Sequence, residues 1–398
     1  MDPVRNPYAP GAGQRPPELA GRDEQLAAFD VTLERVAHGR PERSVVLTGL
    51  RGVGKTVLLN ALRSAAVRSD WGTGKLEARP DQPLRRPLAS ALHMAIRELG
   101  HPQSDEVLGT VKAFAARDSG SGRMRDRWNS GIDVPATTGR ADSGDMEIDL
   151  VELLTDVGGL AADVGRGVAI FVDEMQDLRP EDVSALCAAC HELSQNRLPV
   201  VVVGAGLPHL PAVLSASKSY SERLFRYSRV DRLDRESADR ALVSPARDED
   251  VEFTPGALAE MYAATAGYPY FVQAYGKAVW DAAAGSPVTL DDVRVAAPEA
   301  EAELGVGFFG SRYERATPAE REYLRAMAET AVAEAETSEP EPDSVPTAAV
   351  AAHLDRKPQS LSPARDALLK KGLIYSGERG RIAFTVPHFG RYLRATSG

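Results

Sequence analysis

The sequence predicts an α/β protein: a parallel sheet with helices on its faces, then a helical region and a small C-terminal region of helices and a hairpin. Three apolar runs rich in β-branched residues, 45–48, 168–172 and 200–203, indicate buried strands. A parallel strand that is covered on both faces is apolar along its whole length. Helical patterns separate the runs, which is the alternation expected of a parallel sheet. Later residues change to helical periodicity, and two short strand patterns end the chain.

The composition is typical of a globular protein with two or three domains, since 43% of the 398 residues are hydrophobic and 26% are charged. The formal charge of −10 argues against a protein coated in nucleic acid, although a local basic patch can still bind it. No run of about eighteen apolar residues occurs, and the first residues are polar and rich in proline. We therefore expect no membrane partner and a cytoplasmic location.

The first strand runs into residues 49–56, a turn with the spacing G-x-x-x-x-G-K-T that is typical of a P-loop. Glycines let successive backbone N–H groups point to one centre, and the following helix adds the positive end of its dipole. A glycine turn without a ligand is the alternative, but the apolar helix that follows favours a nucleotide triphosphate. We expect Lys55 to reach the β and γ phosphates and the Thr56 hydroxyl to ligate Mg²⁺. The residues expected to contact the nucleotide are Gly49, Leu50, Arg51, Gly52, Val53, Gly54, Lys55, Thr56 and Val57.

The strand at 168–172 ends in Asp173 and Glu174, an arrangement typical of a Walker B motif. Open α/β sheets place their chemistry at the carboxyl ends of their strands. We expect Asp173 to hold Mg²⁺, directly or through water, and Glu174 to orient or deprotonate the water that attacks the γ-phosphate. Paired acids can also be a solvated strand end, an alternative that the nearby P-loop pattern disfavours.

Cys187, Cys190 and His191 match the C-x-x-C-H pattern of covalent haem attachment. We reject haem as a cofactor, because apolar residues recur around the pattern at helical spacing and the chain shows no export signal. Both cysteines are instead expected to be small core residues of an amphipathic helix.

The P-loop, the strand ending in Asp173 and Glu174, and the third strand together resemble an AAA+ P-loop ATPase. With residues 17–24 upstream, the sequence is most similar to the origin-recognition-like and STAND branches, and the resemblance covers most of the chain. It implies that ATP is the nucleotide, that Gly21 and Arg22 pack near the adenine, and that Glu174 is the catalytic base.

The same resemblance extends to the region before and within the lid. Arg223 occupies the place of an arginine finger, which acts across a subunit interface and would make hydrolysis depend on a homo-oligomer formed with ATP. The alternative is that Arg223, Arg226 and Arg229 form a solvated basic edge. Pro269 lies in a glycine-aromatic-proline stretch similar to the STAND lid, and the resemblance implies that it closes over the nucleotide.

Two departures from the AAA+ pattern predict slow hydrolysis. The third strand leads into Gly204-Ala205-Gly206, where many relatives place a polar residue that positions the attacking water. The lid has Tyr268-Pro269 where others place an arginine that senses the γ-phosphate. We therefore expect a molecular switch in which ATP is a conformational ligand. A nucleotide-sensing regulator or protein-docking scaffold with little or no turnover is the alternative.

The C-terminal region, 306–398, is expected to be a winged helix-turn-helix. A capped helix begins at Thr317-Pro318, another helix covers 361–369, and strand patterns at 373–375 and 381–386 predict a hairpin. The local charge is positive, so the region either binds double-stranded DNA or serves in docking and packing. The residues that would contact DNA are Lys357, Arg365, Lys370, Lys371, Arg379 and Arg381.

The remaining expectations concern domain boundaries. We expect an extended segment at 1–18 that wraps the core, an AAA+ domain at 19–232 and a helical lid at 233–305. Glycine, serine and charge with little periodicity predict a flexible insertion at 117–147, which is a linker or a partner-binding loop. Charge and proline predict a mobile acidic loop at 329–346.

Overall fold

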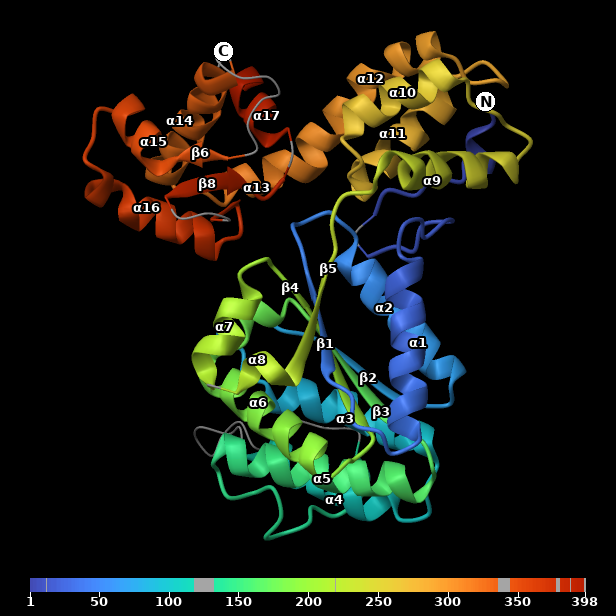
Figure 1. The fold of residues 1–398 in the computed structure, drawn as a ribbon, viewed down its shortest axis with the longest axis vertical. Helices are drawn as coiled ribbons and strands as arrows, with labels where there is room; N and C mark the ends of the chain where they lie inside the picture. The colour runs from blue at the N-terminus through green and yellow to red at the C-terminus, as the bar shows by residue number, and fades with distance from the viewer. Residues whose placement is uncertain are drawn as a thin grey trace. The chain divides into compact units, whose positions relative to one another are not determined.

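The computed structural model of this chain consists of two compact units (Figure 1). The first unit comprises residues 1–21, 50–54 and 231–398, and the second comprises residues 22–49 and 55–230. The structure describes residues 1–11, 13–117, 132–218, 220–335, 344–376, 380–386 and 388–396.

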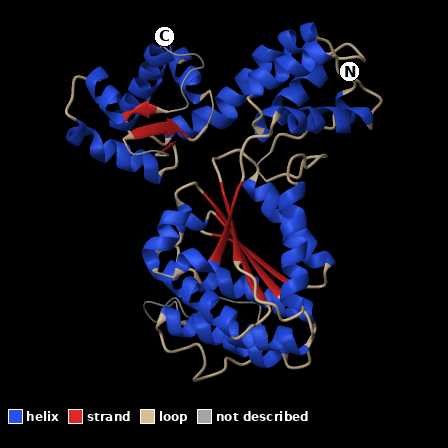
Figure 2. Ribbon diagram, in the orientation of Figure 1, coloured by secondary structure: helices blue, strands red, loops and turns tan. Residues whose placement is uncertain are grey.

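The second unit is built on a five-stranded sheet in which every strand pair is parallel. The strand order is β2-β3-β4-β1-β5, so β4 lies between β1 and β3. Figure 2 shows these strands surrounded by helices. The three predicted strands are confirmed as β1, β3 and β4. The bounds are β1 Ser44–Thr48, β2 Gly72–Glu77, β3 Val168–Asp173, β4 Val200–Gly206 and β5 Phe225–Arg229.

Helices cover both faces of this sheet. Phe171 of β3 packs edge-on against Phe29 of α1 on one face, with ring centroids 6.3 Å apart. The alternate residues Ile170 and Val172 belong to the core formed with α3, α5 and α6 on the other face. The bounds are α1 Asp23–Ala37, α2 Lys55–Arg68, α3 Arg85–Leu99, α4 Ser104–Ala116, α5 Met146–Asp163, α6 Pro180–Gln195, α7 Leu210–Ser217 and α8 Ser221–Leu224.

The sequence pattern does not predict β2 or β5. Strand β2 contains glycines because α3 crosses it closely: a Cβ at Gly74 would lie 2.5 Å from the carbonyl oxygen of Ala91. Strand β5 lies at the sheet edge and is only partly buried, so its sequence lacks a continuous apolar run. Both strands owe their place to neighbouring elements and not to local propensity.

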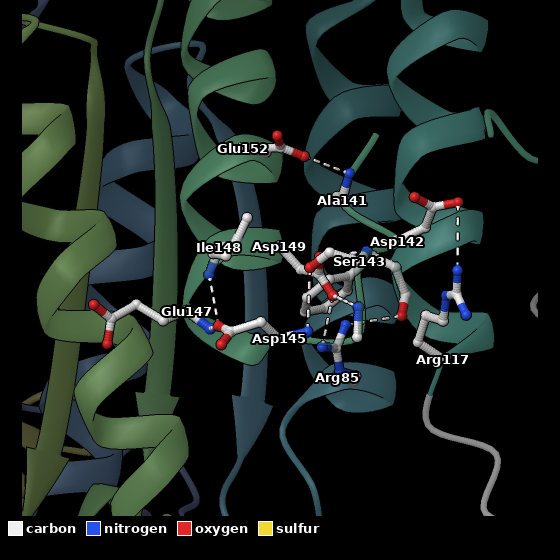
Figure 3. Close-up of polar contacts among 12 residues, drawn as sticks. Arg85, Arg117, Ala141, Asp142, Ser143, Asp145, Glu147, Ile148, Asp149 and Glu152 are labelled. Carbon is white, nitrogen blue, oxygen red and sulfur yellow. Dashed lines mark hydrogen bonds and ion pairs between the residues drawn. The ribbon is translucent and has the colours of Figure 1, made fainter. Parts of the chain in front are cut away.

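A buried polar network fixes the segment before α5 (Figure 3). Arg85 of α3 donates to Asp149 Oδ2 of α5 at 2.7 Å, and Asp149 also accepts bonds from the Ser143 hydroxyl at 2.6 Å and from the backbone N–H groups of Ser143 and Gly144. Burial alone raises the pKa of Asp149, but the bonds from Ser143 and Arg85 outweigh it and hold the pKa below its ordinary value. These contacts anchor the described end of the range 117–147; residues 118–131 lie outside the described residues, and flexibility of the range stays a prediction.

The helical part of the first unit carries the N-terminal segment on its surface. The Trp280 indole donates to the Asp2 carbonyl at 2.9 Å, and the Tyr8 hydroxyl donates to the Leu242 carbonyl at 2.5 Å. The Tyr8 ring lies so close to α11 that a Cβ at Gly276 would come within 2.8 Å of it. This part of the segment therefore packs on the helical region, whereas we expected it to wrap the core. The bounds are α9 Arg235–Arg247, α10 Pro255–Thr265, α11 Pro269–Ala282 and α12 Leu290–Leu304.

The C-terminal part of the first unit contains helices and a small antiparallel sheet of order β6-β8-β7. The predicted hairpin is present, with Ile374 opposite Phe384. Helix α14 extends to Ala335, so residues 329–335 of the expected acidic loop are helical; residues 336–343 of that loop lie outside the described residues. This order of elements is consistent with a winged helix, which remains an interpretation. The bounds are η4 Gly305–Gly310, α13 Ser311–Glu314, α14 Pro318–Ala335, β6 Val345–Pro346, α15 Thr347–His353, α16 Pro358–Lys370, β7 Ile374–Tyr375, β8 Arg381–Phe384 and α17 Phe389–Ala395.

None of the helices in the described ranges is long and apolar enough to cross a membrane.

Candidate active site

The predicted P-loop joins β1 to α2 in the second unit. The Gly49 N–H donates to the Gly206 carbonyl of β4 at 3.2 Å, which ties the start of the loop to the neighbouring strand. Lys55, the first residue of α2, donates from Nζ to the Gly49 carbonyl at 2.9 Å and is 8% exposed. Gly52 and Gly54 have φ values of 83° and 89°, which side chains with a Cβ rarely adopt. The glycines are therefore a backbone requirement of this turn.

The acidic pair lies at the carboxyl end of β3, which is separated from β1 by β4 in the sheet. Asp173 is the last residue of β3 and is 6% exposed, and its Oδ1 accepts the Glu174 N–H at 3.0 Å. Glu174 has φ 49° and ψ 42°, a left-handed conformation that turns the chain out of the strand. Because β1, β4 and β3 are adjacent and parallel, their carboxyl ends share one edge of the sheet. Lys55 and Thr56 thus lie at the same edge as Asp173 and Glu174.

The donor set at this edge fits a magnesium-bound triphosphate. Mg²⁺ prefers one or two carboxylates together with phosphate oxygens and water. The Thr56 hydroxyl and the Asp173 carboxylate are such hard oxygen ligands, and Lys55 supplies a positive charge for phosphate. In the parts of the chain that the structure describes, no group of three or more His, Cys, Asp or Glu side chains forms a metal site of its own. The residues present could therefore hold Mg²⁺ in company with a nucleotide.

Gln176 is a residue of this edge that the sequence analysis missed. It lies in the short 3₁₀ helix η3 (Met175–Asp177), and its Nε2 donates to Glu174 Oε2 at 2.6 Å. Its Oε1 accepts the Leu207 N–H, just beyond β4, at 3.0 Å. The sequence signal for this residue is a glutamine two positions after Glu174. No local sequence pattern, however, predicts its hydrogen bond to Leu207.

Arg223 lies at the amino ends of the parallel strands, opposite to the carboxyl ends that carry the P-loop and the acidic pair. It belongs to α8, immediately before β5, and the first residue of β5, Phe225, pairs with Ser44 at the start of β1. A strand of five residues spans about 16 Å, so Arg223 is far from Lys55 of its own chain. Its action on a neighbouring subunit stays a prediction.

Two further predicted nucleotide contacts lie at the beginnings of helices. Arg22 precedes α1 and is 7% exposed, and Pro269 is the first residue of α11 in the first unit. The role of both, and that of Leu50, Arg51, Val53 and Val57 in the P-loop, stays a prediction.

The basic residues of the C-terminal region are largely engaged within the chain. Lys371 donates to Glu320 at 2.6 Å, Arg365 donates to Asp366, and Arg381 donates to Ser344. Lys357 and Lys370 are exposed at the two ends of α16. Arg379 lies outside the described residues. The positive surface available for DNA is therefore smaller than the sequence indicates.

The C-x-x-C-H pattern lies on α6. Cys187 and Cys190 are buried, as expected of core residues, and burial raises the pKa of the Cys190 thiol to about 12. His191 stacks on Tyr220 with ring centroids 4.6 Å apart. The thiols are thus held in their neutral, unreactive form.

Comparison with known protein families gives matches for two parts of the chain. Residues 18–203 match the AAA ATPase domain family, and residues 306–393 match a domain of unknown function. No curated protein matches the chain. A Walker-type ATPase of Pyrococcus abyssi superposes with a TM-score of 0.57 and 15% identity, over 96% of this chain and 97% of that one. The ORC2 protein of Aeropyrum pernix in its ADP form superposes with a TM-score of 0.54 and 14% identity, over 97% of each chain.

These findings confirm the predicted fold class, a parallel α/β core of the P-loop ATPase kind, and the resemblance of residues 18–203 to AAA ATPase domains.

Proposed function

We propose that this chain, whose residues 18–203 carry an AAA ATPase domain, is a nucleotide switch that binds ATP with Mg²⁺ and hydrolyses it slowly. The observation that carries the proposal is the shared sheet edge: the P-loop lysine and threonine come after β1, and the acidic pair lies at the carboxyl end of β3. A buried lysine and a buried aspartate at the same carboxyl edge of a parallel sheet are suited to polyphosphate and its metal.

The reaction assigns one task to each residue. Lys55 balances charge on the β and γ phosphates, while Thr56 and Asp173 hold Mg²⁺. Mg²⁺ held by these two residues would neutralise the charge that develops on the phosphate oxygens. Glu174 accepts a proton from the water whose oxygen forms the new bond to the γ-phosphorus, as the bond to the bridging oxygen breaks and ADP leaves.

Contacts inside the first unit support a path from the nucleotide to the C-terminal region. A Cβ at Gly52 of the P-loop would lie 3.1 Å from the Phe308 ring, which stacks on Tyr270 with centroids 4.8 Å apart. The adjacent Phe309 stacks on Phe389 of α17 at 5.8 Å. Both phenylalanines belong to the π-helix η4, a kind of element that is frequent at functional sites. A change of the loop on nucleotide binding would thus press on a residue next to the C-terminal contact.

The test measures ATP binding and hydrolysis separately. We expect calorimetry to register Mg²⁺-dependent ATP binding, and single-turnover hydrolysis without a partner to be slower than about one per second. Glu174→Gln is expected to keep ATP affinity and to lower turnover at least about a hundredfold, because the general base is lost. The control Glu192→Gln removes an acid of α6 whose side chain accepts a bond from Asn196 at 2.6 Å, and it is expected to keep the wild-type rate.

Two results contradict the proposal in different ways. Absence of heat with ATP and with GTP overturns nucleotide binding altogether. Tight ATP binding without turnover favours the alternative, a regulator or docking scaffold for which the nucleotide is a ligand only.

We extend the proposal to double-stranded DNA as the partner of the C-terminal region, through the two exposed lysines of α16. Binding by phosphate contacts weakens as salt rises. We expect salt-dependent retardation of duplex DNA that the double variant Lys357→Ala/Lys370→Ala weakens, whereas Lys277→Ala on α11 does not. Absence of retardation at low salt removes the DNA role and leaves protein docking.

A further inference from the structure

Gln176 bridges two strand ends at the candidate active site. Its amide nitrogen donates to the carboxylate of Glu174, just after β3, at 2.6 Å. Its amide oxygen accepts the N–H of Leu207, just after β4, at 3.0 Å. Among the described residues, Gln176 provides the only hydrogen bond to the Glu174 side chain. A carboxylate on a flexible stem otherwise samples several rotamers. The orientation of Glu174 therefore depends on this one amide.

Strand β4 leaves the space that Gln176 needs. A Cβ at Gly206 would lie 2.7 Å from Gln176 Oε1 and 2.6 Å from the Leu210 side chain, and a Cβ at Gly204 would lie 2.4 Å from the Met175 sulfur. Any larger residue at the end of β4 would push the η3 side chains away. The glycines of β4 are thus explained by what η3 places against them.

The bridge continues to the P-loop lysine through backbone groups. Leu207, which donates to Gln176, directly follows Gly206, whose carbonyl accepts the Gly49 N–H. The Gly49 carbonyl in turn accepts Lys55 Nζ at 2.9 Å. One chain of hydrogen bonds and short backbone segments therefore connects the expected base to the residue expected to hold phosphate.

We propose that Gln176 is a positioning residue that orients the Glu174 carboxylate toward the attacking water and ties that orientation to the P-loop through the end of β4. A neutral amide suits this task, because it fixes the carboxylate without a positive charge that would lower its affinity for a proton. The inference rests on the proposed hydrolytic function. β4 ends in Gly206, which has no side chain to position the water. This role of Gln176 explains how the edge still carries an oriented polar group.

The test uses Gln176→Leu, which keeps the size of the side chain and removes both hydrogen bonds. We expect ATP affinity to stay within about twofold and kcat to fall about tenfold to a hundredfold, because a misplaced base loses near-attack geometry. Gln176→Glu keeps the acceptor for Leu207 and replaces the donor by a second carboxylate, so kcat should fall at least as far. The matched control is Gln195→Leu, at the end of α6, where the amide contacts His191; it should keep the wild-type kcat.

A double-variant cycle separates positioning from a merely structural role. Gln176 acts through Glu174, so adding Gln176→Leu to Glu174→Gln should leave the residual rate unchanged within about twofold. A structural residue would instead lower the rate by a similar factor in both backgrounds. Thermal unfolding of each variant shows whether the fold is kept.

The outcomes distinguish the two proposals. If the wild type hydrolyses ATP and Gln176→Leu keeps its kcat, or if the two substitutions act additively, the role of Gln176 is overturned and the ATPase function stands. If the wild type binds ATP without turnover, the hydrolytic function is overturned, and the role of Gln176 falls with it.

Discussion

Two carboxylates of the same unit, Asp149 and Glu174, have opposite surroundings. Asp149 is fully buried and accepts bonds from four donors, one of them the Arg85 guanidinium. Glu174 is half-buried, and among the described residues its side chain accepts one bond, from the neutral amide of Gln176. A cation that neutralises a carboxylate prevents it from taking a proton, whereas an amide orients it and leaves its charge available. The difference teaches that the first acid holds the fold and that the second is suited to chemistry.

The substitution Asp149→Ala tests the structural role of Asp149 and has the largest expected effect. Arg85 would remain buried without its partner, so we expect the free energy of unfolding to fall by about 3–5 kcal/mol. Chemical denaturation measures the loss. The control Asp156→Ala removes the surface partner of Arg140 and should cost less than about 1 kcal/mol. Equal losses in the two variants would show that the buried pair is no more important than a surface pair.

A smaller effect is expected for Gly206→Ala, which probes the space beside Glu174 and not the carboxylate itself. The added methyl group would displace Gln176 Oε1 or the Leu210 side chain, so kcat should fall about tenfold with ATP binding kept. The comparison variant is Gly159→Ala on α5, where a Cβ meets nothing within 4 Å. That change should keep kcat and stabilise the helix by about 0.5–1 kcal/mol. An unchanged kcat in Gly206→Ala would contradict the tight fit.

The smallest expected effect is a pH dependence that belongs to Asp149. Its pKa is lowered in the folded state, so its carboxylate contributes stability above the ordinary value of 3.8 and loses it as pH falls through 3.8 toward the folded-state pKa. The difference in unfolding free energy between the wild type and Asp149→Asn should therefore narrow as pH falls from 6 to 3. Urea denaturation at several pH values measures it. A difference that stays constant with pH would mean that Asp149 titrates normally.

The sequence predicts the parts of the site that are encoded by adjacent residues. Lys55 and Thr56 follow glycines at fixed spacing, and Asp173 and Glu174 end an apolar strand, so both motifs can be recognised without a structure. The shared sheet edge also follows, because parallel strands bring their carboxyl ends together. In the structure, β1 and β3 both pair in parallel with β4, so their carboxyl ends lie at the same edge of the sheet.

Other features depend on contacts between residues far apart in the chain. Gln176 and Leu207 are separated by 31 positions, and Arg85 and Asp149 by 64, so no local pattern announces either contact. In the sequence, the glycines at 204 and 206 indicate a missing polar residue. In the structure, Gly204 makes room for Met175, and Gly206 makes room for the polar Gln176, both from another element. Sequence periodicity reports which face a residue occupies and not which distant side chain meets it.

The packing of the Tyr8 ring against Gly276 of α11 decides where the chain can be cut into separate fragments. The first unit comprises residues 1–21, the short loop 50–54 and residues 231–398, so the sheet unit, 22–49 and 55–230, is inserted within the unit that carries both termini. A fragment of residues 231–398 would lack Tyr8. The surface of α11 around Gly276, which the Tyr8 ring covers in the full chain, would then be exposed. Residues 1–21 supplied as a separate peptide are the natural complement for that fragment.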